Sequence, residues 1–183
     1  AIVPFARAWL ASRVDLVSTE ATHETLAHHG VEVRPLSELT DIEPIPGGQL
    51  KTLHPAIYAG ILARRDRPDQ LAELEAQKIG LIDLVAVNVS QFAPQVGARL
   101  VSIDEAIEMI DVGGAALLAA AARSYASVAA VANPARYLQV IAELRQRGSV
   151  SAVLRQRLAA EAFGIVAAYH AEIAAYLSSL AGD

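Results

Sequence analysis

The segment at residues 81–89 constrains the fold more than any other part of the sequence. It reads Leu-Ile-Asp-Leu-Val-Ala-Val-Asn-Val, so apolar side chains stand at both odd and even positions. A strand with two apolar faces is typical of a parallel sheet that helices cover on both sides, whereas a half-exposed antiparallel strand alternates apolar and polar residues. The segment therefore predicts the buried central strand of an α/β protein.

The rest of the chain alternates helix-like and strand-like segments around this strand. Further short strands are expected at residues 14–17, 31–33 and 127–132, and helices lie between them. Prolines and glycines cluster in residues 37–51, which predicts a loop there. This alternation predicts an α/β fold with a mostly parallel sheet in three layers, α/β/α.

The domain organisation follows from length and from the order of the elements. The 183 residues correspond to one domain, residues 1–183. The chain opens in a helix that should follow a strand. We therefore expect that a first strand is missing and that the domain is truncated at its N-terminus.

Composition excludes several classes of protein. Hydrophobic residues make up 54% of the chain, which argues against intrinsic disorder. The formal net charge of −5 argues against a broad basic face that binds nucleic acid. Cysteine is absent, which removes disulfides and cysteine-ligated metals and suits a cytoplasmic protein. The most apolar stretch, residues 115–132, is rich in alanine and contains Arg123, so we predict a buried helix and strand there and no membrane span.

Ligands of open parallel sheets bind beyond the carboxyl ends of the strands, so the loops at those ends are the candidate sites. Thr19 and Thr22 follow the first predicted strand and open a helix, where hydroxyls and free amides commonly hold a phosphate. Glu20 lies between them and would repel a phosphate. Taken alone, the segment is more simply explained by an ordinary helix cap at Thr19 or Thr22.

The most suggestive loop is residues 47–55, Gly-Gly-Gln-Leu-Lys-Thr-Leu-His-Pro. Its two glycines let the backbone approach a ligand closely. Lys51, Thr52 and His54 then supply an ammonium, a hydroxyl and an imidazole within one turn. A ligand-binding loop and a surface loop with a solvated lysine and a structural histidine remain equal alternatives.

Three further residues have both a functional and a structural interpretation. Asn88 ends the central strand and either contacts a polar ligand or caps the following loop. Asp111 precedes Gly113-Gly114 and either orients a ligand N–H or caps a helix. Arg123 interrupts an alanine-rich helix and either meets a buried anionic partner or extends into solvent from the helix end. The histidines lack metal-ligand spacing, so no metal site is predicted.

Several segments together resemble the IMP cyclohydrolase domain of the bifunctional purine-biosynthesis enzyme, which has a methylglyoxal-synthase-like fold. The order and spacing of these segments match along essentially the whole chain. They are Ser37-Glu38-Leu39-Thr40, Lys51-Thr52-Leu53-His54-Pro55, Ala59-Gly60-Ile61-Leu62-Ala63-Arg64, Ile82-Asp83-Leu84-Val85-Ala86-Val87-Asn88 and Ile110-Asp111-Val112-Gly113-Gly114. The resemblance implies closure of 5-formamidoimidazole-4-carboxamide ribotide to IMP and water, with no metal or organic cofactor, by a cytoplasmic homodimer.

The resemblance also implies roles for individual residues. Lys51 and Asp111 match a catalytic lysine and aspartate of the family, and Arg123 stands where the family has a second lysine. In such a ring closure a cation stabilises charge on the formyl oxygen and an acid–base group moves protons. The implied substrate-binding residues are Thr19, Thr22, Gln49, Thr52, Asn88, Val112 and Gly113. We expect Lys51, Asp111, Asn88 and Arg123 to line one pocket.

The departures from the family pattern gather at these same positions. Glu20 stands in a phosphate loop that normally has glycines, and Gln49 replaces a loop arginine. Ser90 replaces a tyrosine, and arginine at position 123 is a poor proton donor because a guanidinium holds its proton tightly. Two readings follow: an IMP cyclohydrolase, or a catalytically weakened relative that serves as a purine-nucleotide-binding or assembly module. Nothing in the sequence corresponds to the family's formyltransferase domain.

Overall fold

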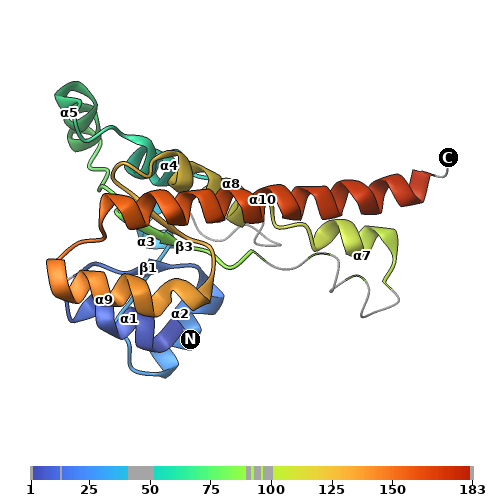
Figure 1. Ribbon diagram of the computed structural model, residues 1–183, viewed down its shortest axis with the longest axis horizontal. Coiled ribbons are helices and arrows are strands. Elements are labelled where there is room, and N and C mark those ends of the chain that lie inside the picture. Colours follow the sequence, from blue (N-terminus) through green and yellow to red (C-terminus); the bar gives the residue numbers. More distant parts are fainter. Residues whose placement is uncertain are drawn as a thin grey trace.

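The computed structural model describes residues 2–12, 14–40, 52–89, 92, 96 and 101–181. Over these residues, helices alternate with four short strands, as the sequence predicts (Figure 1). The helices are α1 Ile2–Leu10, α2 Glu20–His28, α3 Ser37–Thr40, α4 Pro55–Leu62, α5 Pro68–Ala76, α7 Ile103–Glu108, α8 Val112–Arg123, η1 Pro134–Arg136, α9 Tyr137–Arg147 and α10 Ala152–Ala181. The strands are β1 Val17–Ser18, β2 Arg34–Pro35, β3 Leu84–Ala86 and β4 Ala129–Val131.

The strands form two parallel pairs. Val17 of β1 lies opposite Arg34 of β2, and Val85 of β3 lies opposite Ala130 of β4. Each connection within a pair carries at least one helix, as a parallel crossover requires. The predicted α/β class and parallel pairing are therefore confirmed.

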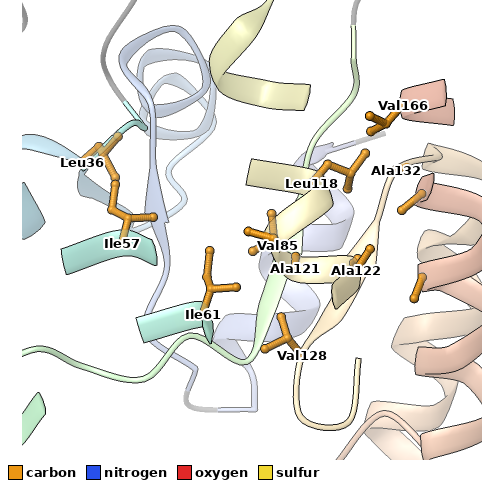
Figure 2. Close-up of a cluster of buried hydrophobic side chains, with 14 residues drawn as sticks. Leu36, Ile57, Ile61, Val85, Leu118, Ala121, Ala122, Val128, Ala132 and Val166 are labelled. Atoms are coloured by element: carbon orange, nitrogen blue, oxygen red, sulfur yellow. The ribbon is translucent and has the colours of Figure 1, made fainter. Parts of the chain in front are cut away.

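The buried strands present apolar side chains to helices on both sides. Val128 and Ala130 pack in a cluster with α4, α8 and the middle of α10. Ala129 and Val131 point the other way, into a cluster with α1, α9 and the start of α10. Figure 2 shows Val85 of β3 between α8 and Ile61 of α4 in the first of these clusters. The two clusters explain why the strand residues are apolar at consecutive positions.

Within the part of the chain that the structure describes, strands β1 and β3 each have an unpaired edge, and both edges border one cavity of about 1680 Å³. The carbonyls of Leu16 and Ser18 accept hydrogen bonds from backbone amides on the β2 side. The backbone N–H and C=O of Val17 therefore point to the other edge of β1, away from β2. The backbone groups of Asp83 and Val87 form hydrogen bonds with β4. The backbone N–H and C=O groups of Leu84 and Ala86 therefore point away from β4. These outward residues line the cavity, together with apolar side chains of α1 and α4. The first strand expected from the sequence stays a prediction.

Local structure departs from the sequence predictions in two places. The predicted loop at residues 37–51 begins with the short helix α3, and its remainder, residues 41–51, lies outside the described residues. Helix α4 follows it and was not predicted. His54 is the N-cap of α4, because its Nδ1 accepts a hydrogen bond from the Ala56 amide at 3.2 Å, and Pro55 occupies the first turn. His54 thus has a structural role.

Helix α10 is long and apolar enough to cross a membrane by length and composition alone. It nevertheless packs against α8 and β4 in the centre of the domain (Figure 1). A stripe along one side is buried, consisting of Leu154, Leu158, Ala162, Val166, Tyr169 and Ile173. This spacing of three or four residues is that of a helix face turned to a core.

Candidate functional site

Asp111 stands at the start of α8 and is held by two hydrogen bonds. Its Oδ1 accepts from the Gly114 amide at 2.7 Å, which makes it the N-cap of the helix. Its own amide donates to the hydroxyl of Tyr169 at 2.6 Å. The capping interpretation from the sequence is thus correct. A carboxylate has about four lone-pair sites, so capping does not prevent Asp111 from accepting a further N–H.

Thr19 and Glu20 form the start of α2, directly after β1. Thr19 is the N-cap residue, yet its side chain makes no capping hydrogen bond. The neighbouring Ser18 Oγ is buried and has no hydrogen-bond partner in the described part of the chain. Two hydroxyls not used by the local backbone therefore lie at a helix N-terminus, where an anion is favoured. Glu20 is the first residue of the same helix and brings a negative charge to this end.

Asn88 follows β3, and its side chain forms a hydrogen bond with Tyr137, the first residue of α9. Burial raises the pKa of the Tyr137 hydroxyl, and a hydrogen bond from the Asn88 side chain acts in the opposite direction. The Tyr137 ring stacks on Phe5 with centroids 4.0 Å apart, so this hydroxyl has a fixed position. Asn88 itself is exposed, and one polar group of its side chain remains for another partner.

The structure brings most of the predicted site residues to one cavity. The segments after β1 and β3, the segment before α4 and the start of α8 contribute to its wall Thr19, Thr22, Asn88, Thr52, Asp111, Val112 and Gly113. Residues of β1, β3, α1 and α4 also line the cavity, so the candidate site is only part of it. Among the described residues, no cluster of histidines and carboxylates is arranged to hold a metal ion.

Arg123 does not join this group. It is the last residue of α8, and Asp111 caps the first turn of the same helix. Twelve helical residues span about 18 Å, at 1.5 Å of rise per residue. Arg123 is exposed and does not line the cavity. The expectation that Arg123 shares a pocket with Asp111 is therefore corrected, because a helix separates the two side chains.

Lys51 and Gln49 lie outside the described residues, as does Ser90. Thr52, the residue after Lys51, lines the cavity.

Sequence reasoning missed Tyr169 because its contact with Asp111 spans 58 residues. The only local signal is a tyrosine on the buried stripe of α10, a place where its hydroxyl needs a partner.

The MGS-like domain model matches residues 1–116, and this range includes every element of the site described above except Tyr169 and Tyr137. The chain belongs to the MGS-like domain family. A second model, that of the AICARFT/IMPCHase bienzyme, matches residues 121–183. The predicted methylglyoxal-synthase-like fold is thereby confirmed.

The chain is similar to several curated relatives that share the name bifunctional purine biosynthesis protein PurH. It is 46% identical to that of Chloroflexus aurantiacus over 176 residues, or 96% of this chain, and 43% identical to that of Synechocystis over 169 residues, or 92%. A relative from Listeria monocytogenes is 41% identical over 182 residues. The chain spans only about a third of their lengths, 33–36%.

Among solved structures, the crystal structure of ForH matches with a TM-score of 0.82 and 32% identity. This match covers 94% of the present chain and 90% of ForH, so the similarity extends over the whole domain.

Proposed function

We propose that this chain is an IMP cyclohydrolase, which closes 5-formamidoimidazole-4-carboxamide ribotide to IMP and water. The observation that carries the proposal is the placement of Asp111, which shares a cavity with the α2 N-terminus and with Asn88. The Asp111 carboxylate is proposed to meet the base of the ligand, and the hydroxyls at the α2 N-terminus its phosphate. Relatives named for purine biosynthesis support the same assignment.

The reaction needs little beyond positioning and proton transfer. The carboxamide nitrogen attacks the formyl carbon of the same molecule, forming a C–N bond while the formyl oxygen takes a proton. The carboxamide nitrogen gives up one proton in this step. The resulting carbinolamine then loses its hydroxyl as water, with the second proton coming from the former formamide nitrogen, and a C=N bond is left in the new ring. Holding the two groups close supplies much of the acceleration.

Asp111 is proposed to accept the N–H of the attacking carboxamide, which orients the nitrogen and receives its proton. Lys51 is proposed as the cation beside the formyl oxygen. Gln49, Thr52, Val112 and Gly113 are proposed to contact the base and ribose, and Thr19 and Thr22 the phosphate. Arg123 is given no role in this cavity, because it lies at the far end of α8. No metal or organic cofactor is needed for these steps.

Turnover of the formylated ribotide by the purified chain tests this proposal. Formation of IMP, followed by absorbance and chromatography, is the expected result. A folded chain that forms no IMP would refute it.

A second candidate function is supported by Glu20, whose charge at the α2 N-terminus opposes phosphate binding. In that case the chain is a weakened relative that binds purine nucleotides or serves assembly. A chain that binds IMP but does not turn over the ribotide would favour this function.

Replacing Glu20 by glycine is expected to tighten IMP binding by about twofold to fivefold, because the phosphate then no longer meets a carboxylate at a helix N-terminus, where a charge contributes roughly 0.3–1 kcal/mol. Calorimetric titration with IMP measures the change. Glu24→Gly, one turn later on the same helix and exposed, is the control and should bind like the parent chain. Unchanged affinity in Glu20→Gly would mean that the phosphate lies elsewhere.

We further propose that the chain forms a homodimer in the cytoplasm. The C-terminal part of α10 extends well beyond the body of the domain (Figure 1). Its Leu177 and Leu180 are 42% and 43% exposed, and Phe163 earlier on the helix is 48% exposed. A second copy is the proposed cover for these apolar side chains.

Leu177→Glu is expected to weaken the dimer at least about tenfold, because it places a charge in an apolar contact. Sedimentation velocity across a concentration series measures the association. Ser178→Glu adds the same charge at the next position, which is already polar, and should have a smaller effect. A parent chain that stays monomeric at every concentration would contradict the homodimer.

A further inference from the structure

Tyr169 contacts the candidate site from a distant element. It lies on α10, and its hydroxyl oxygen accepts a hydrogen bond from the Asp111 amide at 2.6 Å. Only 4% of Tyr169 is exposed, so water has little access to this contact. The bond thus joins α10 to Asp111, the N-cap residue of α8.

The bond completes the restraint on Asp111. The side chain is held from within α8, since its Oδ1 accepts from the Gly114 amide at 2.7 Å. That bond alone fixes the carboxylate relative to its own helix. The Tyr169 bond fixes the Asp111 backbone relative to α10, which packs on both α8 and β4. The two bonds together set where the carboxylate stands relative to the sheet and the cavity.

Packing alone does not require the hydroxyl of Tyr169. Its ring belongs to a cluster with Phe92, Ala115 and Ile173, all buried. Tyr176 lies on the same helix and packs against the same cluster, with its ring edge-to-face with that of Phe92 and the ring centroids 5.3 Å apart. A phenylalanine at position 169 would fill the same space, so the oxygen is what distinguishes this position.

We propose that Tyr169 is a positioning residue, which aligns Asp111 with the reacting carboxamide through the Asp111 amide. The inference rests on the proposed cyclohydrolase function for its consequence in catalysis. Its structural part, the restraint of Asp111 by a hydroxyl of α10, stands apart from that function. Small misplacements of a reacting group cost up to about 100-fold in rate, so loss of this restraint should be measurable.

The experiment compares Tyr169→Phe with the matched control Tyr176→Phe in the full chain. IMP formation gives kcat and KM, and calorimetric titration with IMP gives the number of binding sites, so that kcat is expressed per intact site. We expect Tyr169→Phe to lower kcat by about tenfold or more while KM changes less than about twofold. Tyr176→Phe should keep both constants. A kcat per site in Tyr169→Phe equal to that of the parent chain would overturn the proposal.

A second measurement does not depend on turnover. Amide hydrogen exchange in the parent chain should show the Asp111 amide protected, and exchange at this amide should accelerate at least about tenfold in Tyr169→Phe but not in Tyr176→Phe. An unprotected Asp111 amide in the parent chain would overturn the proposal even if the variant fails to fold. If the parent chain forms no IMP while its Asp111 amide behaves as expected, the proposed function fails and the restraint by Tyr169 stands.

Discussion

Asp111→Asn should reduce IMP formation by about 100-fold or more, while the domain stays folded. Asparagine keeps the size of the side chain and still caps a helix, so the Gly114 amide retains an acceptor. What is lost is the negative charge that receives the carboxamide proton, and acid–base groups contribute roughly 100- to 10,000-fold. Initial rates with the formylated ribotide, together with thermal unfolding, measure both properties.

Asp104→Asn is the matched control for this prediction. Asp104 lies near the start of another helix, in the first turn of α7, but it is exposed and does not line the cavity. It should retain full activity. Undiminished turnover in Asp111→Asn would remove Asp111 from the mechanism and leave it a cap only.

Gly114→Ala should impair both stability and turnover. A Cβ at this position would collide with the Asp111 carboxylate, with the Asp111 Cγ only 2.9 Å away. The carboxylate must therefore leave its place, and the cap is lost with it. Relative to Gly164→Ala, which carries the same helix preference of alanine, we expect a loss of about 1–2 kcal/mol in the free energy of unfolding, typical of a lost N-cap. We also expect at least about a tenfold fall in kcat.

Gly164→Ala provides the control for this substitution. Gly164 lies on an exposed side of α10, and a Cβ there meets nothing within 4 Å. Alanine is favoured over glycine inside a helix by about 1 kcal/mol, so this variant should be as stable as the parent chain or more stable. Chemical unfolding of both variants measures the difference. If Gly114→Ala behaves like Gly164→Ala, the Asp111 carboxylate does not need its present position.

The fold was predictable because β3 and β4 pack apolar side chains on both sides. Residues 81–89 are apolar at consecutive positions, and the structure explains this pattern through the two clusters that Val85 and its neighbours join. Boundaries were less predictable: the strand predicted at residues 31–33 is β2 at Arg34–Pro35. Pairing with β1 sets that position, and the apolar pattern of the segment does not reveal it.

The site was predictable only where local sequence determines it. Asp111 before two glycines indicates a helix start, and the structure has one there. The interpretation of Arg123 depended on its distance from Asp111, which follows from the full length of α8 and not from residue type. Tyr169 is linked to Asp111 only by tertiary packing, which a single sequence does not disclose.

The most direct test of the central claim is a cyclohydrolase assay of the purified chain with the formylated ribotide, run beside Lys51→Ala and with IMP binding measured by calorimetry. We predict IMP formation by the parent chain and its abolition in Lys51→Ala, which excludes a contaminating enzyme as the source. Saturable IMP binding without turnover would contradict the cyclohydrolase and identify a nucleotide-binding relative. Neither turnover nor binding by a folded sample would mean that the chain keeps the fold without a working site.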